Sequence, residues 1–254
     1  MSSTPRIAWD NQLTAATWTL SPVESGNDDP IGNAADVRPW TFWIPENTSP
    51  VAIADFGSSK TVTAFCLAGH DASGTIGFDT WNGAAWVQFG TATATGDGST
   101  IYVTGTAVST SKVRFRFPAT FTFLAYAFAG EDLICPEGLA PGWSDPVLAQ
   151  RAKTTPEMSR GGVWLGTAVE LWNAQLTLSL KAVTTAWAQT YWQPFLRACS
   201  TKPFFLTWNE DEFPNSGCLC TDADFGGSAF AQRGFCDVEV SFNADTGLDR
   251  RLTP

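Results

Sequence analysis

The chemistry open to this chain is limited first by its single histidine, His70. His70 is followed by Asp71, so it could act as a general base that the neighbouring carboxylate orients. Every Ser-His-Asp, Cys-His or histidine-ligated metal arrangement would have to use this one residue. A loop histidine that holds a turn through hydrogen bonds is the more common role in such a setting. We therefore expect no catalytic centre at His70, and keep it as a candidate ligand-binding residue.

Cysteines are the second group that could do chemistry, and the chain has six of them. Four could supply the thiolates of a zinc or iron–sulfur site, namely Cys199, Cys218, Cys220 and Cys236. Only the Cys-x-Cys spacing of residues 218 and 220 is typical of such a site, while Cys199 and Cys236 lie on apolar faces, where a thiol behaves as a small hydrophobe. We expect no metal and no cofactor. The sequence leaves open whether these four cysteines bind metal or pair as disulfides.

Clustered carboxylates could serve as the acid and base of a glycosidase. The candidates are the run Glu210-Asp-Glu and the pair Asp222 and Asp224. The pattern of both is typical of solvated charges in loops. Weak calcium binding is the main alternative for such oxygen-rich loops. The glycine pairs Gly96-Asp-Gly and Gly226-Gly lack the Lys-Ser/Thr that follows in a phosphate-binding loop. We therefore predict that the protein is not an enzyme.

Tryptophan is abundant, with 12 residues, and most of these rings must be buried. Those in turn-rich segments could instead stack on sugar rings. Trp81 and Trp86 flank an Asn-Gly turn, and together with His70 they are the candidate ligand-binding residues. The pair Trp40 and Trp43 is a further candidate for such an aromatic face.

Composition and charge narrow the partners. The chain has 254 residues, of which 44% are hydrophobic and 16% charged, enough to bury one large or two medium cores. Fifteen basic against 25 acidic residues give a net charge of −10, which disfavours binding to nucleic acid. The first residues lack the pattern of a signal peptide, and no apolar run has membrane-spanning length. We expect a chain made in the cytoplasm, with no membrane insertion.

The elements that position these residues are mainly strands. Between residues 51 and 128, short apolar runs alternate with Gly, Asp and Ser, which is the spacing of a β-sandwich. From Lys112 to Phe117 apolar and basic residues alternate strictly, so Val113 and Phe115 face a core. Residues 1–50 show little periodicity, and we expect loops that insert Trp18, Trp40 and Trp43 as aromatic plugs.

The second half changes character after residue 135. Residues 136–162 are rich in Gly, Pro and Ser and predict an extended connector. Alternating strands follow, and then a helix over about residues 184–199, which Thr184 or Thr185 can cap. Its expected inward face carries Trp187, Tyr191, Phe195 and Cys199, with Ala188 and Trp192 beside them. Pro194 should kink or break the helix near residues 190–193.

The first part resembles a known family. The segment 51–71 (VAIADFGSSKTVTAFCLAGHD), the run Trp81-Asn-Gly-Ala-Ala-Trp and the run Lys112-Val-Arg-Phe-Arg-Phe are similar to the discoidin-like, or galactose-binding-like, jelly roll. The resemblance covers about residues 1–130. It implies a domain over residues 1–135 that binds glycans, lipids or proteins through loops at one end.

The second part resembles tail proteins of long-tailed bacteriophages. The resemblance rests on Gly130-Glu-Asp-Leu-Ile-Cys-Pro, on Ser159-Arg-Gly-Gly, on the helix that ends Trp-Gln-Pro-Phe-Leu, and on Lys202-Pro-Phe-Phe-Leu-Thr-Trp. It implies a tail-tube or distal-tail fold over residues 163–254, a β-sandwich with one packed helix. It also implies a hexameric ring at the virion tail tip, between the tail tube and the baseplate hub.

The sequence leaves two functions open. The first is a structural distal or minor tail protein, whose second domain joins the ring while the jelly roll reaches outward to a protein or a host surface glycan. The alternative is a stand-alone lectin-like module that binds carbohydrate. In both, the fold is mainly β and comprises two domains.

Overall fold

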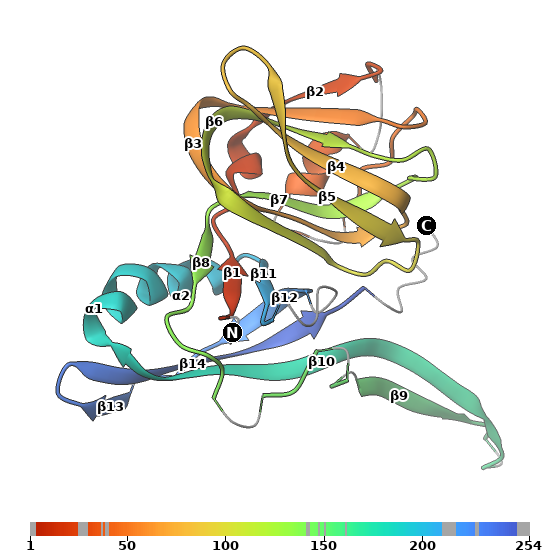
Figure 1. The fold of residues 1–254 in the computed structure, drawn as a ribbon. Coiled ribbons are helices and arrows are strands. Elements are labelled where there is room, and N and C mark those ends of the chain that lie inside the picture. The colour runs from red at the N-terminus through yellow and green to blue at the C-terminus, as the bar shows by residue number, and fades with distance from the viewer. Residues whose placement is uncertain are drawn as a thin grey trace.

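The chain is built mainly of antiparallel strands in two sheets, with one helical segment (Figure 1). This confirms the mainly β fold class. Among the residues that the structure describes, no helix is long and apolar enough to cross a membrane. This computed structural model describes residues 4–24, 30–36, 38, 41–140, 143–146, 148–149, 151–160, 162–209, 217–226 and 229–247.

The six-stranded sheet forms the upper unit in Figure 1. Its strands are β2 (Thr17–Ser21), β3 (Val51–His70), β4 (Ser73–Trp81), β5 (Trp86–Thr95), β6 (Ile101–Arg116) and β7 (Leu124–Gly130). They run in the order β2-β3-β6-β4-β5, and β7 pairs with β3. Two short 3-10 helices, η1 (Gln12–Ala15) and η2 (Ile31–Ala35), lie in the segment that was expected to be loops.

Two long strands close this sheet into a sandwich. The start of β3 pairs with β2 and with the end of β6, whereas its last residues pair with β7 and with the start of β6. A register shift between Asp55 and Lys60 marks the change of partner. Because β3 and β6 pass from one layer to the other, the two layers enclose one core, as in a jelly roll.

Aromatic side chains fill this core. Val113 and Phe115 are buried while Arg114 and Arg116 lie on the outer face, which confirms the alternation predicted from the sequence. Trp43 is fully buried with its ring 5.3 Å from that of Phe121. Trp18 packs partly buried against the same core, so both rings act as plugs. Trp40 lies outside the described residues.

The second sheet has eight strands. They are β1 (Arg6–Ala8), β8 (Asp132–Ile134), β9 (Arg151–Met158), β10 (Trp164–Thr184), β11 (Phe204–Thr207), β12 (Cys218–Asp224), β13 (Ala229–Gln232) and β14 (Phe235–Asp245). The order is β8-β1-β11-β12-β14-β10-β9, with β13 beside β14.

Strand pairing differs from the expected division of the chain at two places. Strands β1 and β8 come from residues 1–135, yet they belong to the second sheet. Strand β9 lies within the expected connector 136–162 and pairs with β10. The reason is length: β1 and β8 span three residues each, too few to show an alternating pattern.

The helix lies where the sequence predicts it. It consists of α1 (Thr185–Trp187), the π-helical turn η3 (Ala188–Trp192) and α2 (Gln193–Cys199). Thr184 caps it, since its side chain accepts a hydrogen bond from the backbone N–H of Trp187 at 3.3 Å. The π turn ends two residues before Pro194, whose missing N–H removes one donor from the helix.

The buried face of the helix differs from the expected one. Trp192, Phe195 and Cys199 are buried against the second sheet, but Tyr191 is 52% exposed and Trp187 only half-buried. The wider π turn changes the angle between successive side chains, so the four-residue spacing of a regular helix no longer places Tyr191 inward.

The second sheet is covered on both faces. The helix packs on one face, and the jelly roll packs on the other through β3 and β7. There Tyr126 stacks on Phe205 with ring centroids 5.7 Å apart. The second layer of the expected C-terminal sandwich is therefore the jelly roll itself.

Candidate functional site

His70 lies at the end of β3 and is only 2% exposed. Burial lowers the pKa of the imidazole, and the charges of Asp71 and Asp97 and an interaction with the Ser99 backbone oppose this shift. Asp71 does not orient it, because that carboxylate accepts hydrogen bonds from the backbone N–H groups of Thr122 and Phe123. The structure thus places His70 at the buried end of a strand, away from Trp81 and Trp86.

Trp81 and Trp86 face each other at the end of the β4–β5 hairpin, which points away from the second sheet (Figure 1). Their ring centroids are 5.3 Å apart at an interplanar angle of 63°, and both side chains are half-buried. The Asn82 side chain accepts hydrogen bonds from the N–H groups of Ala84 and Ala85, which fixes the turn. Two of the three candidate ligand-binding residues thus lie together.

An ion cluster adjoins this pair on the outer face of the sheet. Asp79 is 3% exposed and accepts from Nε of Arg114 and Nε of Arg116, each at 2.8 Å. The hydrogen bond to Asp79 raises the pKa of Arg116. The guanidinium carbon of Arg114 lies 4.7 Å from the centroid of the Trp86 ring. We call Trp81, Trp86, Asp79, Arg114 and Gln88 the aromatic platform.

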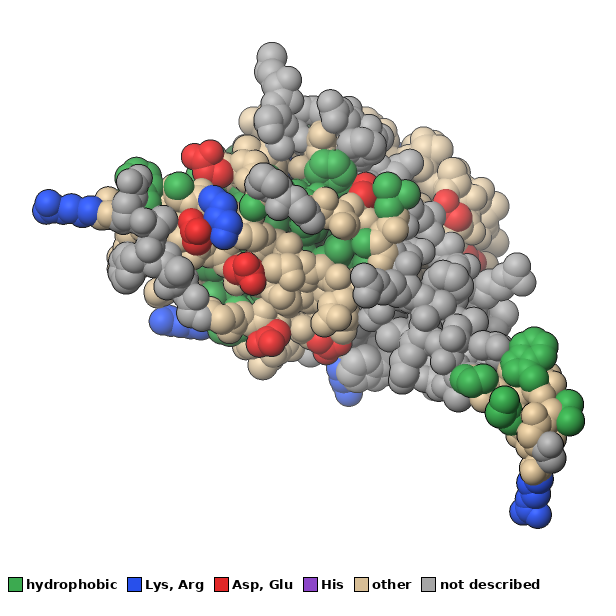
Figure 2. Space-filling model, turned by 90° about the horizontal axis from the view of Figure 1, so that it is seen from below, with side chains coloured by type: hydrophobic (Ala, Val, Ile, Leu, Met, Phe, Trp, Pro, Cys, Tyr) green, Lys and Arg blue, Asp and Glu red, His purple; other side chains and the backbone are tan. Residues whose placement is uncertain are grey.

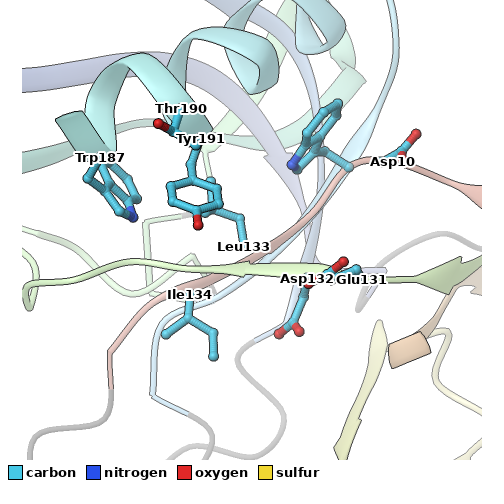
Figure 3. Close-up of a pocket in the computed structure, with 9 residues that line it drawn as sticks. Asp10, Glu131, Asp132, Leu133, Ile134, Trp187, Thr190 and Tyr191 are labelled. Carbon is cyan, nitrogen blue, oxygen red and sulfur yellow. The ribbon is translucent and has the colours of Figure 1, made fainter. Parts of the chain in front are cut away.

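A second candidate site is a cleft of about 480 Å³ between the helix and strand β8 (Figure 3). Trp187 and Tyr191 descend from the helix, with ring centroids 6.2 Å apart, and Trp9 lines the same space. Leu133 and Ile134 form the opposite wall. We call this space the aromatic cleft.

One end of the aromatic cleft is acidic. Asp10 and Glu131 are exposed there, whereas Asp132 is buried and accepts from Nη1 of Arg6 at 3.0 Å. The sequence did not predict this cleft, because the residues that line it come from three segments far apart in the chain. The available signal was the pair Trp187 and Tyr191, which the four-residue spacing assigned to the core.

A third feature is an apolar arm. Strand β9 and the first part of β10 form a two-stranded extension beyond the body of the molecule (Figure 1). Hydrophobic side chains gather at its end, with a basic side chain beyond them (Figure 2). Met158, Val163, Trp164 and Leu165 are 64, 64, 63 and 65% exposed, and Arg160 is exposed in the turn. We call residues 158–160 and 162–165 the arm tip.

The cysteines and carboxylates lie elsewhere. All six cysteines are buried free thiols, and no three metal-binding side chains come together in the described part of the chain. Cys218 and Cys220 place their sulfur atoms 3.6 Å apart in the second core. Asp222 accepts a hydrogen bond from Asn243, and Asp224 is exposed at the end of β12. The run 210–212 lies outside the described residues.

The fold and these sites define a two-sheet β protein whose first unit is a jelly-roll sandwich. No protein-family model matches the chain, and no curated protein matches it either.

Solved structures match about half of the chain. Chitosan-binding module 1, derived from a chitosanase/glucanase of Paenibacillus sp. IK-5, has a TM-score of 0.40 and 22% identity over 48% of this chain and 98% of that one. CpGH89CBM32-5 from Clostridium perfringens, solved with GalNAc-β-1,3-galactose, has a TM-score of 0.41 and 14% sequence identity. The match covers 47% of this chain and 99% of that one. SpGH29 has a TM-score of 0.41 and 15% sequence identity over 48% of this chain, but the match spans only 28% of SpGH29.

Proposed function

We propose that this chain is a non-catalytic carbohydrate-binding protein that holds a glycan on the aromatic platform. The observation that carries this proposal is the half-exposed Trp81–Trp86 pair beside the Arg114–Asp79 ion pair. A sugar ring presents an apolar C–H face and polar hydroxyl edges. Such a ligand needs an aromatic surface with hydrogen-bonding groups next to it, which is what these residues provide.

Strand register places the polar groups in a row beside the rings. Gln88 on β5 is opposite Asp79 on β4, and Asp79 is opposite Arg114 on β6. The next row toward the turn is Trp86 opposite Trp81. Arg114 donates to Asp79 through Nε, and its two terminal amino groups are further donors that a sugar hydroxyl can accept from.

The charge of this face favours neutral or acidic glycans. Lys112, Arg114 and Arg116 lie on it with Asp55 and Asp79, so three positive charges meet two negative ones and leave a local charge of +1. The whole chain carries −10. The face that carries the platform is therefore more basic than the protein as a whole, and a cationic sugar would be disfavoured there.

Cross-strand aromatic pairs also stabilise hairpins without binding anything, so the test must separate the two roles. A glycan array screened with the intact chain should give hits, and calorimetry with the best hit should show at least about a tenfold loss of affinity for Trp86→Ala, from the loss of ring stacking worth about 1.4 kcal/mol or more. Gln88→Ala, which leaves both rings in place, should weaken binding with no change in unfolding free energy.

Trp164→Ser is the matched control, because Trp164 is an exposed tryptophan far from the platform. It should bind the glycan as the unaltered chain does. Absence of hits at millimolar glycan, or equal affinity for Trp86→Ala and the unaltered chain, would contradict the proposal. Turnover of the bound glycan would contradict its non-catalytic part.

A second candidate is a structural subunit at the tail tip of a long-tailed bacteriophage, in a hexameric ring between tail tube and baseplate hub. The exposed arm tip favours it, because a monomer rarely exposes so many apolar side chains in one place. Peptide mass spectrometry and antibody labelling of purified virions should then find the chain at the tail tip. Virions that lack the chain would contradict this candidate.

A further inference from the structure

We propose that copies of this chain join head to tail, with the arm tip of one copy inserted into the aromatic cleft of the next and Trp164 packed against the rings of Trp187 and Tyr191. The arm tip and the cleft are surfaces separate from the aromatic platform, so this inference stands independently of carbohydrate binding.

The arm tip is an ordered turn that exposes large apolar side chains. Its turn is ordered by hydrogen bonds from Ser159 N–H to the Val163 carbonyl at 2.8 Å and from Gly162 N–H to the Ser159 carbonyl at 2.9 Å. Met158 and Trp164 are cross-strand partners next to that turn. Each is more than 60% exposed, 64% and 63%. Leaving such side chains in water costs free energy that a partner surface would recover.

The aromatic cleft matches the tip in size and chemistry. Its volume of about 480 Å³ is in the range of pockets that take a ligand of a few ring systems. Trp9, Trp187 and Tyr191 offer ring faces and edges to an incoming indole. Ile134 is 50% exposed on the opposite wall, so the cleft also lacks an apolar cover.

Charge selects the orientation. Arg160 is the basic residue of the turn, and Asp10 and Glu131 are the exposed carboxylates of the cleft. Glu157 is also exposed on the arm, but it lies farther from the turn than Arg160. With a net charge of −10, two copies repel one another at long range, so a local opposite-charge contact is needed to bring them together.

The occupant must be another copy rather than the same one. The arm tip and the helix that lines the cleft lie at opposite ends of the second sheet (Figure 1). A contact between two different surfaces is heterologous, so it leaves one tip and one cleft unfilled after each addition. Such contacts continue until the chain of copies closes into a ring or extends as a filament.

The test is the oligomeric state of the intact chain, measured by light scattering and native mass spectrometry over a range of concentrations. The unaltered chain should form oligomers. Trp164→Ser and Tyr191→Ala should each raise the dissociation constant at least about tenfold, since either change removes one side of the ring contact. Both residues are exposed, so circular dichroism should show an unchanged fold.

Charge reversal distinguishes this contact from general stickiness. Arg160→Glu should weaken association about tenfold, and adding Glu131→Arg in the same chain should restore it, because tip and cleft then exchange signs. Val23→Ser is the control, as Val23 is 80% exposed on the other unit. An unaltered chain that stays monomeric at all concentrations, oligomers that persist in Trp164→Ser, or a double variant without rescue would each overturn the proposal.

Discussion

Nη1 of Arg6 lies 3.0 Å from Oδ2 of Asp132, and this ion pair joins β1 to β8 in the second sheet. The other oxygen of Asp132 accepts a hydrogen bond from the hydroxyl of Thr63 in β3. The Asp132 side chain is 1% exposed, while Arg6 is 23% exposed. One carboxylate therefore binds strands of both sheets together.

Replacing this carboxylate should be costly. Asp132→Ala removes the ion pair with Arg6 and the acceptor that Asp132 offers to the Thr63 hydroxyl. We expect a loss of about 2–4 kcal/mol in the free energy of unfolding, measured by urea denaturation. Asp55→Ala, which breaks the exposed pair with Lys112, should cost less than about 1 kcal/mol. Equal losses for the two variants would refute the role given to Asp132.

The buried ring of Phe195 contributes more to the packing of the helix on the second sheet than any exposed ring of the helix does. Phe195 is fully buried, with ring centroids 5.1 Å from both Trp192 and Phe204. Phe195→Ala should lower the unfolding free energy by about 3–5 kcal/mol, through lost burial and a cavity. Tyr191→Ala, on the same helix but exposed, should change it by less than about 1 kcal/mol. A small effect of Phe195→Ala in thermal unfolding would show that the helix is not docked as described.

Stability should fall on mild acidification because of His70. Burial lowers the pKa of His70 in the folded chain below the value of 6.5 for a free imidazole. Between those two pKa values the unfolded chain binds more protons, so the free energy of unfolding decreases as the pH falls through 6.5 toward the folded-state pKa. Each pKa unit by which folding lowers the pKa of His70 corresponds to a loss of about 1.4 kcal/mol in the free energy of unfolding once the pH lies below both pKa values.

The measurement is urea unfolding at several pH values from 7.5 to 5.5. His70→Gln retains a polar side chain that does not titrate, so its unfolding free energy should vary less over this interval than that of the unaltered chain. Identical pH profiles for the two proteins would exclude His70 as the source of the dependence.

The thiols should resist chemical labelling in the folded chain. Burial raises the pKa of Cys135 to about 12 and that of Cys199 to about 12, and it also raises the pKa of Cys220 well above its usual value. Since the thiolate is the reactive form, iodoacetamide at pH 8 should label these residues only after urea unfolding. Rapid labelling of the native chain, followed by peptide mass spectrometry, would show that the second core opens readily.

The sequence predicted those parts of the fold that depend on local patterns. Alternation placed Val113 and Phe115 inward, and the capping side chain of Thr184 marked the helix start. Patterns within a short window carry this information because side chains alternate in strands and caps use adjacent residues. The contact between Trp81 and Trp86 is also local, since a short hairpin turn separates them.

Features that depend on distant segments could not be predicted. The aromatic cleft needs Trp9, Glu131 and Trp187 to meet, and no local pattern encodes that meeting. The exposure of Tyr191 depends on a π turn, which follows from the proline three residues later but changes the face in a way that helical spacing does not anticipate. Strand β9 was hidden within a segment rich in Gly and Pro.

The position of β1 inside the second sheet has a consequence for how the protein is made. Ile7 pairs with Leu133 on one side and with Leu206 on the other, so β1 can join its neighbour β11 only after all residues between these two strands have been translated. Cutting the chain at the connector would leave the C-terminal fragment without β1 and β8, with an open gap beside β11. The residues after the connector therefore cannot form the complete second sheet by themselves.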